Sequence, residues 1–274
     1  MLNKLNLASG SIFVSDNGWL NFDYGGDGKL VRRANLLSRM PLPDNSADLV
    51  YSSHFLEHIP YSLVPDFLVE CRRLLCPNGV IRVVLPDLEN MCQAYLDYRN
   101  ASSHEKADFI VLELIDQCVR RAQGGELGRY YEAIMEQPGL SQSMIDFVRE
   151  RTGEDLFSSP SRRRRSWRSI LSRLLRLNDN ARIHFATLLL PKAFRDQNIS
   201  FCSVGEKHHW IYDEFMISRL LMQAGFQSIQ RMSASSSLYP NFPFHPLDVD
   251  TDGKPRKGAE SMYIEAVKSE RLKP

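Results

Sequence analysis

Apolar positions in the first 90 residues fall into short runs separated by polar and turn-forming residues. Such runs lie at residues 5–10, 19–23, 47–53 and 80–85, and each has the length and composition of a strand. Residues 64–75 instead carry apolar side chains at helical spacing, and a Pro-Asn-Gly turn follows them. Because the run at 80–85 is almost continuously apolar, we expect both of its faces to be covered. Strands joined by crossovers of this kind predict a parallel α/β sheet.

The pattern changes near residue 89 and returns near residue 206. Residues 89–205 are helical in pattern and richer in charge, which indicates an insert. Beyond them, residues 212–225 predict a helix that ends at a glycine, and strands are expected at 226–232 and 261–267. We therefore predict a core built from residues 1–88 and 206–274, with residues 89–205 as a helical insert or lid.

The first two strands end in residues suited to a nucleotide-type ligand. The strand at 5–10 runs into the small-residue turn Ala8-Ser9-Gly10, where the backbone can approach a ligand closely. The strand at 19–23 ends in Asp23, whose carboxylate can accept hydrogen bonds from two ribose hydroxyls. Since residues 8–19 are barely enough for a parallel connection, we expect a turn rather than a full helix between these strands.

Composition and charge narrow the class of protein. The 274 residues carry a net charge of +1, which argues against nucleic-acid binding over the whole surface. No apolar run is long enough to span a bilayer, and the first core strand begins too early to leave room for a signal peptide. The five cysteines are odd in number and widely spaced, so we expect reduced thiols in a cytoplasmic protein.

Four stretches in a specific order resemble a known family of enzymes. Residues 5–10, 18–23, 42–58 and 212–226 are together similar to class I S-adenosylmethionine-dependent methyltransferases, and more narrowly to a short bacterial group whose chains open directly on the first strand. The similarity covers roughly residues 1–90 and 205–270 and leaves the insert out. It implies a Rossmann-like, doubly wound, mostly parallel seven-stranded α/β sheet and S-adenosylmethionine as the cofactor.

The resemblance also implies which residues hold the cofactor. They are Leu7, Ala8, Ser9 and Gly10 at the methionine part, Asp23 at the ribose, Asn35 and Leu36 beside the adenine, and Ser52 and Ser53 on the other side of the pocket. Ala8 stands where the family often has Gly, and Asn35 stands where Asp is common. An alanine suits this turn only if its φ is negative. Asn35 keeps an acceptor for the adenine amino group without the charge.

Residues 54–58 spell His-Phe-Leu-Glu-His, and the motif has three interpretations. In methyl transfer, His54 or His58 would remove a proton from the acceptor, with Glu57 as orienting partner and His208 as a further candidate base. Alternatively, the histidines are packing residues. The letters also match the inverted zinc-peptidase motif. Because that motif belongs inside a long helix, we expect no metal site and keep a zinc-dependent hydrolase only as an alternative.

Four more residues are candidates for contact with the acceptor. They are Asp87, His209, Trp210 and Tyr212, in loops that could reach the carboxyl edge of the sheet, where such folds bind their ligands. Each has a structural alternative. Asp87 could cap the helix that follows it, and the segment around His209 could fix the start of the next helix.

Two further motifs have more than one interpretation. Residues 248–253 imitate the first half of a calcium loop, but Ala259 stands where the closing Glu is needed, so we expect a solvated turn. Residues 161–176 combine an apolar helical face with surrounding arginines. They predict a lid helix, with an interfacial helix drawn to anionic lipid or a contact to a phosphate-bearing or nucleic-acid substrate as alternatives.

The residues and the resemblance together predict methyl transfer from S-adenosylmethionine to an oxygen of a small-molecule or glycan acceptor. A non-catalytic binding protein on the same fold is the main alternative. We expect a cytoplasmic, bacterial protein without a nucleic-acid partner, whose residues 161–176 are a candidate contact to the inner membrane face. The sequence predicts no oligomeric state.

Overall fold

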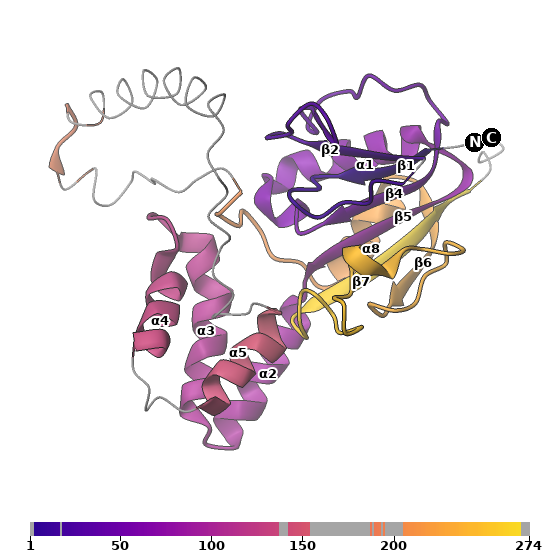
Figure 1. The fold of residues 1–274 in the computed structure, drawn as a ribbon. Coiled ribbons are helices and arrows are strands. Elements are labelled where there is room, and N and C mark those ends of the chain that lie inside the picture. The colour runs from indigo at the N-terminus through magenta and orange to yellow at the C-terminus, as the bar shows by residue number, and fades with distance from the viewer. Residues whose placement is uncertain are drawn as a thin grey trace.

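A single seven-stranded sheet organises the molecule. The computed structural model describes residues 3–16, 18–136, 142–153, 187, 189–192, 194 and 205–269. The sheet has the order β3-β2-β1-β4-β5-β7-β6 (Figure 1). Its strands are β1 (Asn3–Leu7), β2 (Trp19–Asp23), β3 (Val31–Arg33), β4 (Ala47–Ser53), β5 (Leu75–Pro86), β6 (Phe226–Met232) and β7 (Ser261–Lys268). Neighbours from β3 to β5 run parallel, whereas β7 runs antiparallel to both β5 and β6. The predicted Rossmann-like, mostly parallel fold is therefore confirmed.

The two faces of the sheet are covered by different layers. On one face, α1 (Val64–Leu74) and α8 (Glu214–Gln223) pack against apolar side chains such as Val50 and Ile81. On the other face, the loop after β1 and the segment between β6 and β7 cover Leu49 and Val84. That segment contains only the short α9 (Phe244–Leu247). The continuous burial of residues 79–86 of β5 between these layers explains the nearly unbroken apolar sequence there.

Four helices lie beside the sheet rather than on it (Figure 1). They are α2 (Leu88–Asn100), α3 (His104–Val119), α4 (Gly125–Glu136) and α5 (Gln142–Thr152). Their apolar sides form a cluster of their own that includes Phe109 and Phe147. At the end of α5, Arg151 lies 2.9 Å from Glu113 on α3, and its carbonyl accepts a hydrogen bond from Glu260, just before β7. Among the described residues, no helix has the length and apolar character needed to cross a membrane.

The helical character of this part agrees with the sequence pattern, but two expectations remain predictions. The insert bounds of residues 89–205 stay a prediction, since most of residues 154–204 lie outside the described part of the chain. The basic stretch at 161–176 lies outside the described residues.

The connection after β1 was predicted from the sequence pattern, whereas the short strand β3 was not. The described residues between β1 and β2 contain turns and no helix, which confirms the expected short crossover. The edge strand β3 had not been recognised. Only Val31 of its three residues is buried, while Arg32 and Arg33 are exposed, so no alternating pattern marks it.

A buried charge cluster joins the loop-covered face to the β6–β7 segment. Arg82 on β5 is fully buried, and its guanidinium contacts Asp248 and Glu265 at 2.7 Å each. The Tyr51 hydroxyl donates to the second oxygen of Asp248 at 2.8 Å. The expectation of a solvated turn is therefore wrong for Asp248, which is buried because it pairs with Arg82. It holds for the exposed tip at Thr251–Gly253.

Candidate functional site

Several strand ends meet at the carboxyl edge of the sheet. The turn after β1 and the end of β2 lie side by side there, and their contact is specific. Asp23 Oδ2 accepts a hydrogen bond from the Gly10 amide at 3.0 Å, and Oδ1 accepts one from the Gly25 amide at 2.8 Å. These bonds fix the carboxylate while each oxygen keeps a lone pair for a ligand.

Two residues at this edge, Ala8 and His54, have a left-handed backbone conformation that is unfavourable for residues other than glycine. Ala8 has a φ of +60° and Gly10 a φ of +53°. The condition for an alanine at this turn, a negative φ, is therefore not met, since the turn takes its left-handed form without the glycine that would favour it. His54, just after β4, also has a positive φ of +49°. Strained residues of this kind persist where the surrounding structure fixes them, and they are often found in binding sites.

A cavity of about 400 Å³ opens beside Asp23, and we call it the Asp23 cavity. Ala8, Asp23, Asn35 and Leu36 line it as expected. The Asn35 side-chain oxygen already accepts from the Leu37 amide at 3.1 Å, which holds this loop in a turn. Leu7 and Ser52 were predicted to line the pocket, but both are buried in the sheet and line none of the described cavities. A strand directs alternate side chains to opposite faces, so proximity to the strand end did not place them in the pocket.

A second cavity of about 560 Å³ adjoins the first, and we call it the Glu260 cavity. Ser9, Gly10 and Ser53 line it, together with His208. Ala8, His54, His58 and Gly205 line both cavities, so these residues mark the junction.

Several residues that line the Glu260 cavity were not predicted from the sequence. They are Gln117 on α3, Arg120 just after it, Tyr131 on α4, and Arg256, Lys257 and Glu260 before β7. Only Arg256, Lys257 and Glu260 could have been predicted from the sequence. They precede β7, and a strand antiparallel to the rest of the sheet begins at the edge where the parallel strands end. Burial and the neighbouring Glu113 raise the pKa of the Glu260 carboxyl.

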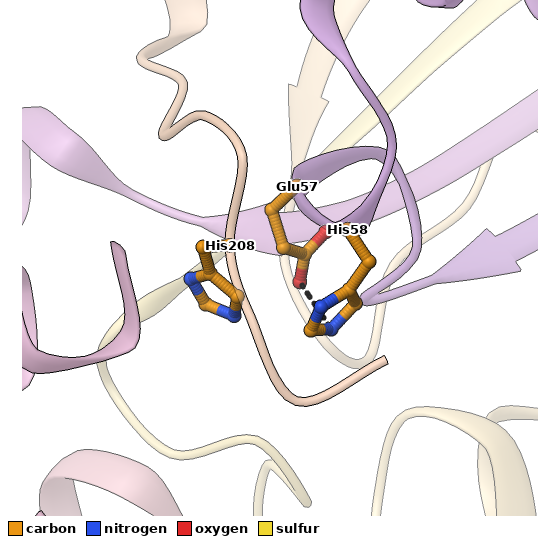
Figure 2. A group of neighbouring side chains, drawn as sticks. All are labelled: Glu57, His58 and His208. Carbon is orange, nitrogen blue, oxygen red and sulfur yellow. Dashed lines mark ion pairs between the residues drawn. The ribbon is translucent and has the colours of Figure 1, made fainter. Parts of the chain in front are cut away.

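At the junction, three imidazoles surround one carboxylate. Glu57 is fully buried in the 3₁₀ turn Leu56–His58, where its Oε1 lies 3.2 Å from His54 Nδ1 and 4.0 Å from His58 Nε2. Figure 2 shows that His208 approaches from a separate loop on the other side. The rings of His58 and His208 pack edge to face with centroids 4.7 Å apart. The structure thus brings together all four residues predicted to be catalytic.

Burial and the contacts among the four side chains together set the charge state of the cluster. Burial lowers the pKa of His208 to about 4, and with the charge of Lys257 it also lowers the pKa of His54. For Glu57, burial acts to raise the pKa, but the His54 contact and the neighbouring imidazoles outweigh it and lower the pKa to about 2. The carboxylate is therefore ionised at neutral pH.

The four candidate acceptor contacts are not part of the two cavities. Asp87 accepts from the Asn90 amide at the start of α2 and pairs with Arg231, so it has the capping role that was its alternative. Trp210 is 42% exposed and packs on Tyr61, while Tyr212 is fully buried. His209 has an exposed side chain, and only its amide reaches the site, where it donates to the Glu57 carbonyl at 2.6 Å. The segment thus shapes the cluster through its backbone.

The long helix that a zinc-peptidase motif requires is not formed at residues 54–58. His54 precedes the turn, and only Leu56–His58 is helical, so the two histidines do not follow each other along one face of a long helix. The peptidase motif requires that arrangement to hold its ion.

The sequence matches a known family model over part of its length. The family model described as a methyltransferase domain matches residues 23–83, from the end of β2 into β5. A stretch of 61 residues is 41% identical to the acyl-coenzyme A thioesterase MBLAC2 of Gallus gallus. That stretch makes up 22% of this chain and 22% of the thioesterase, so the chain matches less than a quarter of this relative.

Comparison of the structures gives looser similarities. S-adenosylmethionine-dependent methyltransferases of Archaeoglobus fulgidus and Methanosarcina mazei are 11% and 12% identical, each with a TM-score of 0.41. They cover 97% and 98% of this chain, and 86% and 93% of their own. Human N-acetylserotonin methyltransferase in complex with S-adenosylmethionine has a TM-score of 0.35 at 12% identity, over 97% of this chain and 40% of its own. Similarities this loose say nothing of the substrate.

Proposed function

We propose that this chain, a class I S-adenosylmethionine-dependent methyltransferase, methylates an oxygen of a small-molecule or carbohydrate-type acceptor. The observation that carries the proposal is the position of the Glu57 cluster at the junction of two cavities. A base at such a junction can serve an acceptor in one cavity while the methyl donor occupies the other.

The Asp23 cavity fits the nucleoside part of the cofactor. Asp23 keeps one free lone pair on each oxygen for the ribose hydroxyls, and Leu36 and Leu37 offer apolar contacts to a flat ring. Ala8 and His54 lie where this cavity meets the next one. We propose that the methionine part passes there, towards the Glu260 cavity.

The cluster supplies the proton acceptor. When bound, S-adenosylmethionine supplies a methyl group to which the acceptor oxygen bonds through a lone pair, as the carbon–sulfur bond breaks and its electrons remain on sulfur. His58 is our choice of base because its Nδ1 contacts the Lys207 carbonyl at 3.1 Å. A neutral ring that donates there has its lone pair on Nε2, which faces the junction. The carboxylate of Glu57 would stabilise the imidazolium that forms.

The lining of the Glu260 cavity supports a polar acceptor. Arg256 and Lys257 offer positive charge, Glu260 offers a carboxyl group, and Ser9 and Ser53 offer hydroxyls. A volume of about 560 Å³ suits a ligand of one or two sugar rings. We therefore propose a hydroxyl-rich acceptor, with sugar phosphates as the first compounds to test. The cytoplasmic location expected from the cysteines remains part of the proposal.

Methyl transfer tests the proposal directly. The full chain is incubated with S-adenosylmethionine carrying a labelled methyl group and a panel of free and phosphorylated monosaccharides. We expect a labelled product whose NMR spectrum shows a methyl group on oxygen. His58→Ala should abolish most turnover. His209→Ala, which removes an exposed imidazole outside both cavities, should retain it. A labelled N-methyl product would overturn the assignment to oxygen, and cofactor binding without transfer to any acceptor would favour a binding protein.

A further inference from the structure

The Glu57 carboxylate lacks the partners that a buried charge requires. It is completely buried, yet neither of its oxygens accepts a hydrogen bond of good geometry from the described residues. His54 Nδ1 is close, at 3.2 Å, but is too poorly directed to satisfy it. Within the described part of the chain, no Lys or Arg side chain lies within ion-pair distance of it. A buried carboxylate of this kind is stable only with a positive partner.

Hydrogen bonds on the outer side of His58 fix its tautomer. The Nδ1 atom lies 3.1 Å from the Lys207 carbonyl, which can only accept, so Nδ1 carries the proton. In the neutral ring, Nε2 then presents a lone pair at 4.0 Å from Glu57 Oε1. Two electron-rich atoms therefore face each other across a gap that is too long for a direct hydrogen bond. A backbone carbonyl that orients the outer nitrogen is the usual arrangement around a metal-binding histidine.

The same reasoning applies to His54. The Ser261 hydroxyl donates to the Lys257 carbonyl at 3.1 Å, so its oxygen accepts from His54 Nε2 at 3.0 Å. The Nδ1 atom of a neutral His54 then carries a lone pair and no proton, so it does not donate to Glu57 Oε1, which lies 3.2 Å away. The outer partners of His54 and His58 thus leave their inner nitrogens without a proton to donate to the Glu57 carboxylate.

We propose that Glu57, His58 and His208 bind a divalent transition-metal ion of the zinc class. One potential ligand atom from each residue lies within 4.8 Å of the others. Two imidazole nitrogens and one carboxylate oxygen are a ligand set that zinc accepts, with bonds of about 2.0–2.2 Å. Binding would draw the atoms about 1 Å closer together. Figure 2 shows His208 on a separate loop from Glu57 and His58, so its side chain can approach them independently.

Three protein ligands leave one coordination position open, as in catalytic rather than structural zinc sites. His58 and His208 both line the Glu260 cavity, so the open position would face the acceptor. An ion there would lower the pKa of the acceptor hydroxyl, so that the hydroxyl could lose its proton to water instead of to His58, the base of the metal-free cluster. This consequence rests on the proposed function, whereas the binding of the ion does not.

Metal titration of the untagged full chain tests the inference without any acceptor. The protein is stripped with chelator and titrated with Zn²⁺ by calorimetry and with Co²⁺ by visible absorption. We expect one equivalent of Zn²⁺ per chain and the intense Co²⁺ absorption of a four-coordinate site. His208→Ala should weaken Zn²⁺ binding at least about 100-fold. The matched control is His209→Ala, which removes an exposed imidazole one position away and should bind Zn²⁺ like the wild type.

A thermal melt of each metal-free variant shows whether it is folded, and Zn²⁺ should raise the Tm of the wild type and of His209→Ala only. The inference is overturned if the wild type binds no stoichiometric Zn²⁺, or if His208→Ala and His209→Ala bind it equally. Should Zn²⁺ bind while no acceptor is methylated, the metal site stands and the proposed function fails. Should the chelated protein methylate its acceptor at full rate and bind no Zn²⁺, the metal site alone fails.

Discussion

Two buried clusters of ionisable side chains lie on this sheet, and they differ in how their charges are satisfied. In the first cluster, the Arg82 guanidinium contacts Asp248 and Glu265 at 2.7 Å each. The Tyr51 hydroxyl donates a hydrogen bond to Asp248. Around Glu57, three imidazoles surround a carboxylate whose oxygens have no well-directed hydrogen bond. Both clusters are shielded from water, so a missing partner is costly in either.

The difference indicates different roles. The Arg82 cluster lies under the β6–β7 segment, and its charged members Arg82, Asp248 and Glu265 line none of the described cavities, so its completed contacts hold that segment on the sheet. The Glu57 cluster lies at the junction of two cavities, so its incomplete contacts are available to a ligand. Functional sites commonly retain unsatisfied groups at the expense of stability.

The largest effect on stability is expected at Arg82. Arg82→Ala leaves Asp248 and Glu265 buried without their cation, and we expect the free energy of unfolding to fall by about 3–5 kcal/mol. Urea denaturation of the variant and the wild type measures this difference. A loss below about 1 kcal/mol would mean that the cluster does not hold the segment in place.

The largest effect on turnover is expected at His58. His58→Ala removes the proposed base and should lower kcat about 100-fold or more, because general base catalysis typically contributes at least that factor. The dissociation constant of S-adenosylmethionine should change little, since Asp23 and the turn after β1 are untouched. Steady-state kinetics and calorimetry on one preparation give both numbers. Equal kcat values for His58→Ala and His209→Ala would contradict the role of the cluster.

The same substitution in both clusters gives the sharpest contrast. Glu265→Gln removes a charge that Arg82 needs and should destabilise the protein by about 1.5–3 kcal/mol. Glu57→Gln removes an unpaired charge and should leave the stability of the metal-free protein unchanged or raise it by about 1 kcal/mol, while turnover falls. Denaturation in the presence of chelator compares the two variants. Similar destabilisation by both would show that Glu57 is as well satisfied as Glu265.

The smallest effect is expected at the turn after β1. The left-handed backbone conformation at Ala8 costs an alanine about 1–2 kcal/mol, and Ala8→Gly removes this cost. The greater freedom of glycine in the unfolded chain offsets part of the gain. We expect a net gain of about 0.5–1 kcal/mol and equal or tighter cofactor binding. Thermal denaturation and calorimetry would detect both, and a loss of stability would show that the Ala8 methyl group makes a contact of its own.

Local patterns were sufficient to predict much of the sheet. The bounds of β2, β4 and β6 agree with the sequence because each strand has buried positions between turn-forming residues. The helix expected at 212–225 was also correct, since Asp213 caps α8 and Gly225 ends it with a φ of +87°. β3 was missed because three residues with one buried side chain carry no periodic pattern.

The site was less accessible to such patterns because it depends on long-range contacts. Residues 54–58 identified one side of the cluster, but nothing local to His208 indicated that its side chain, rather than that of His209, would turn inwards. Asp248 resembled a calcium-loop residue until the structure showed Arg82 beside it. Leu7 and Ser52 adjoin residues of the site in sequence, but their side chains are buried within the sheet.

The central claim is that the carboxyl edge of the sheet binds S-adenosylmethionine beside the Glu57 cluster. Calorimetric titration of the wild type, Asp23→Ala and Asp27→Ala with S-adenosylmethionine tests it most directly. Asp27 is the matched control, because its carboxylate holds its own turn but lies outside the Asp23 cavity. We predict saturable binding by the wild type and Asp27→Ala and its loss in Asp23→Ala. Absence of binding to the wild type, or binding unchanged by Asp23→Ala, would contradict the account.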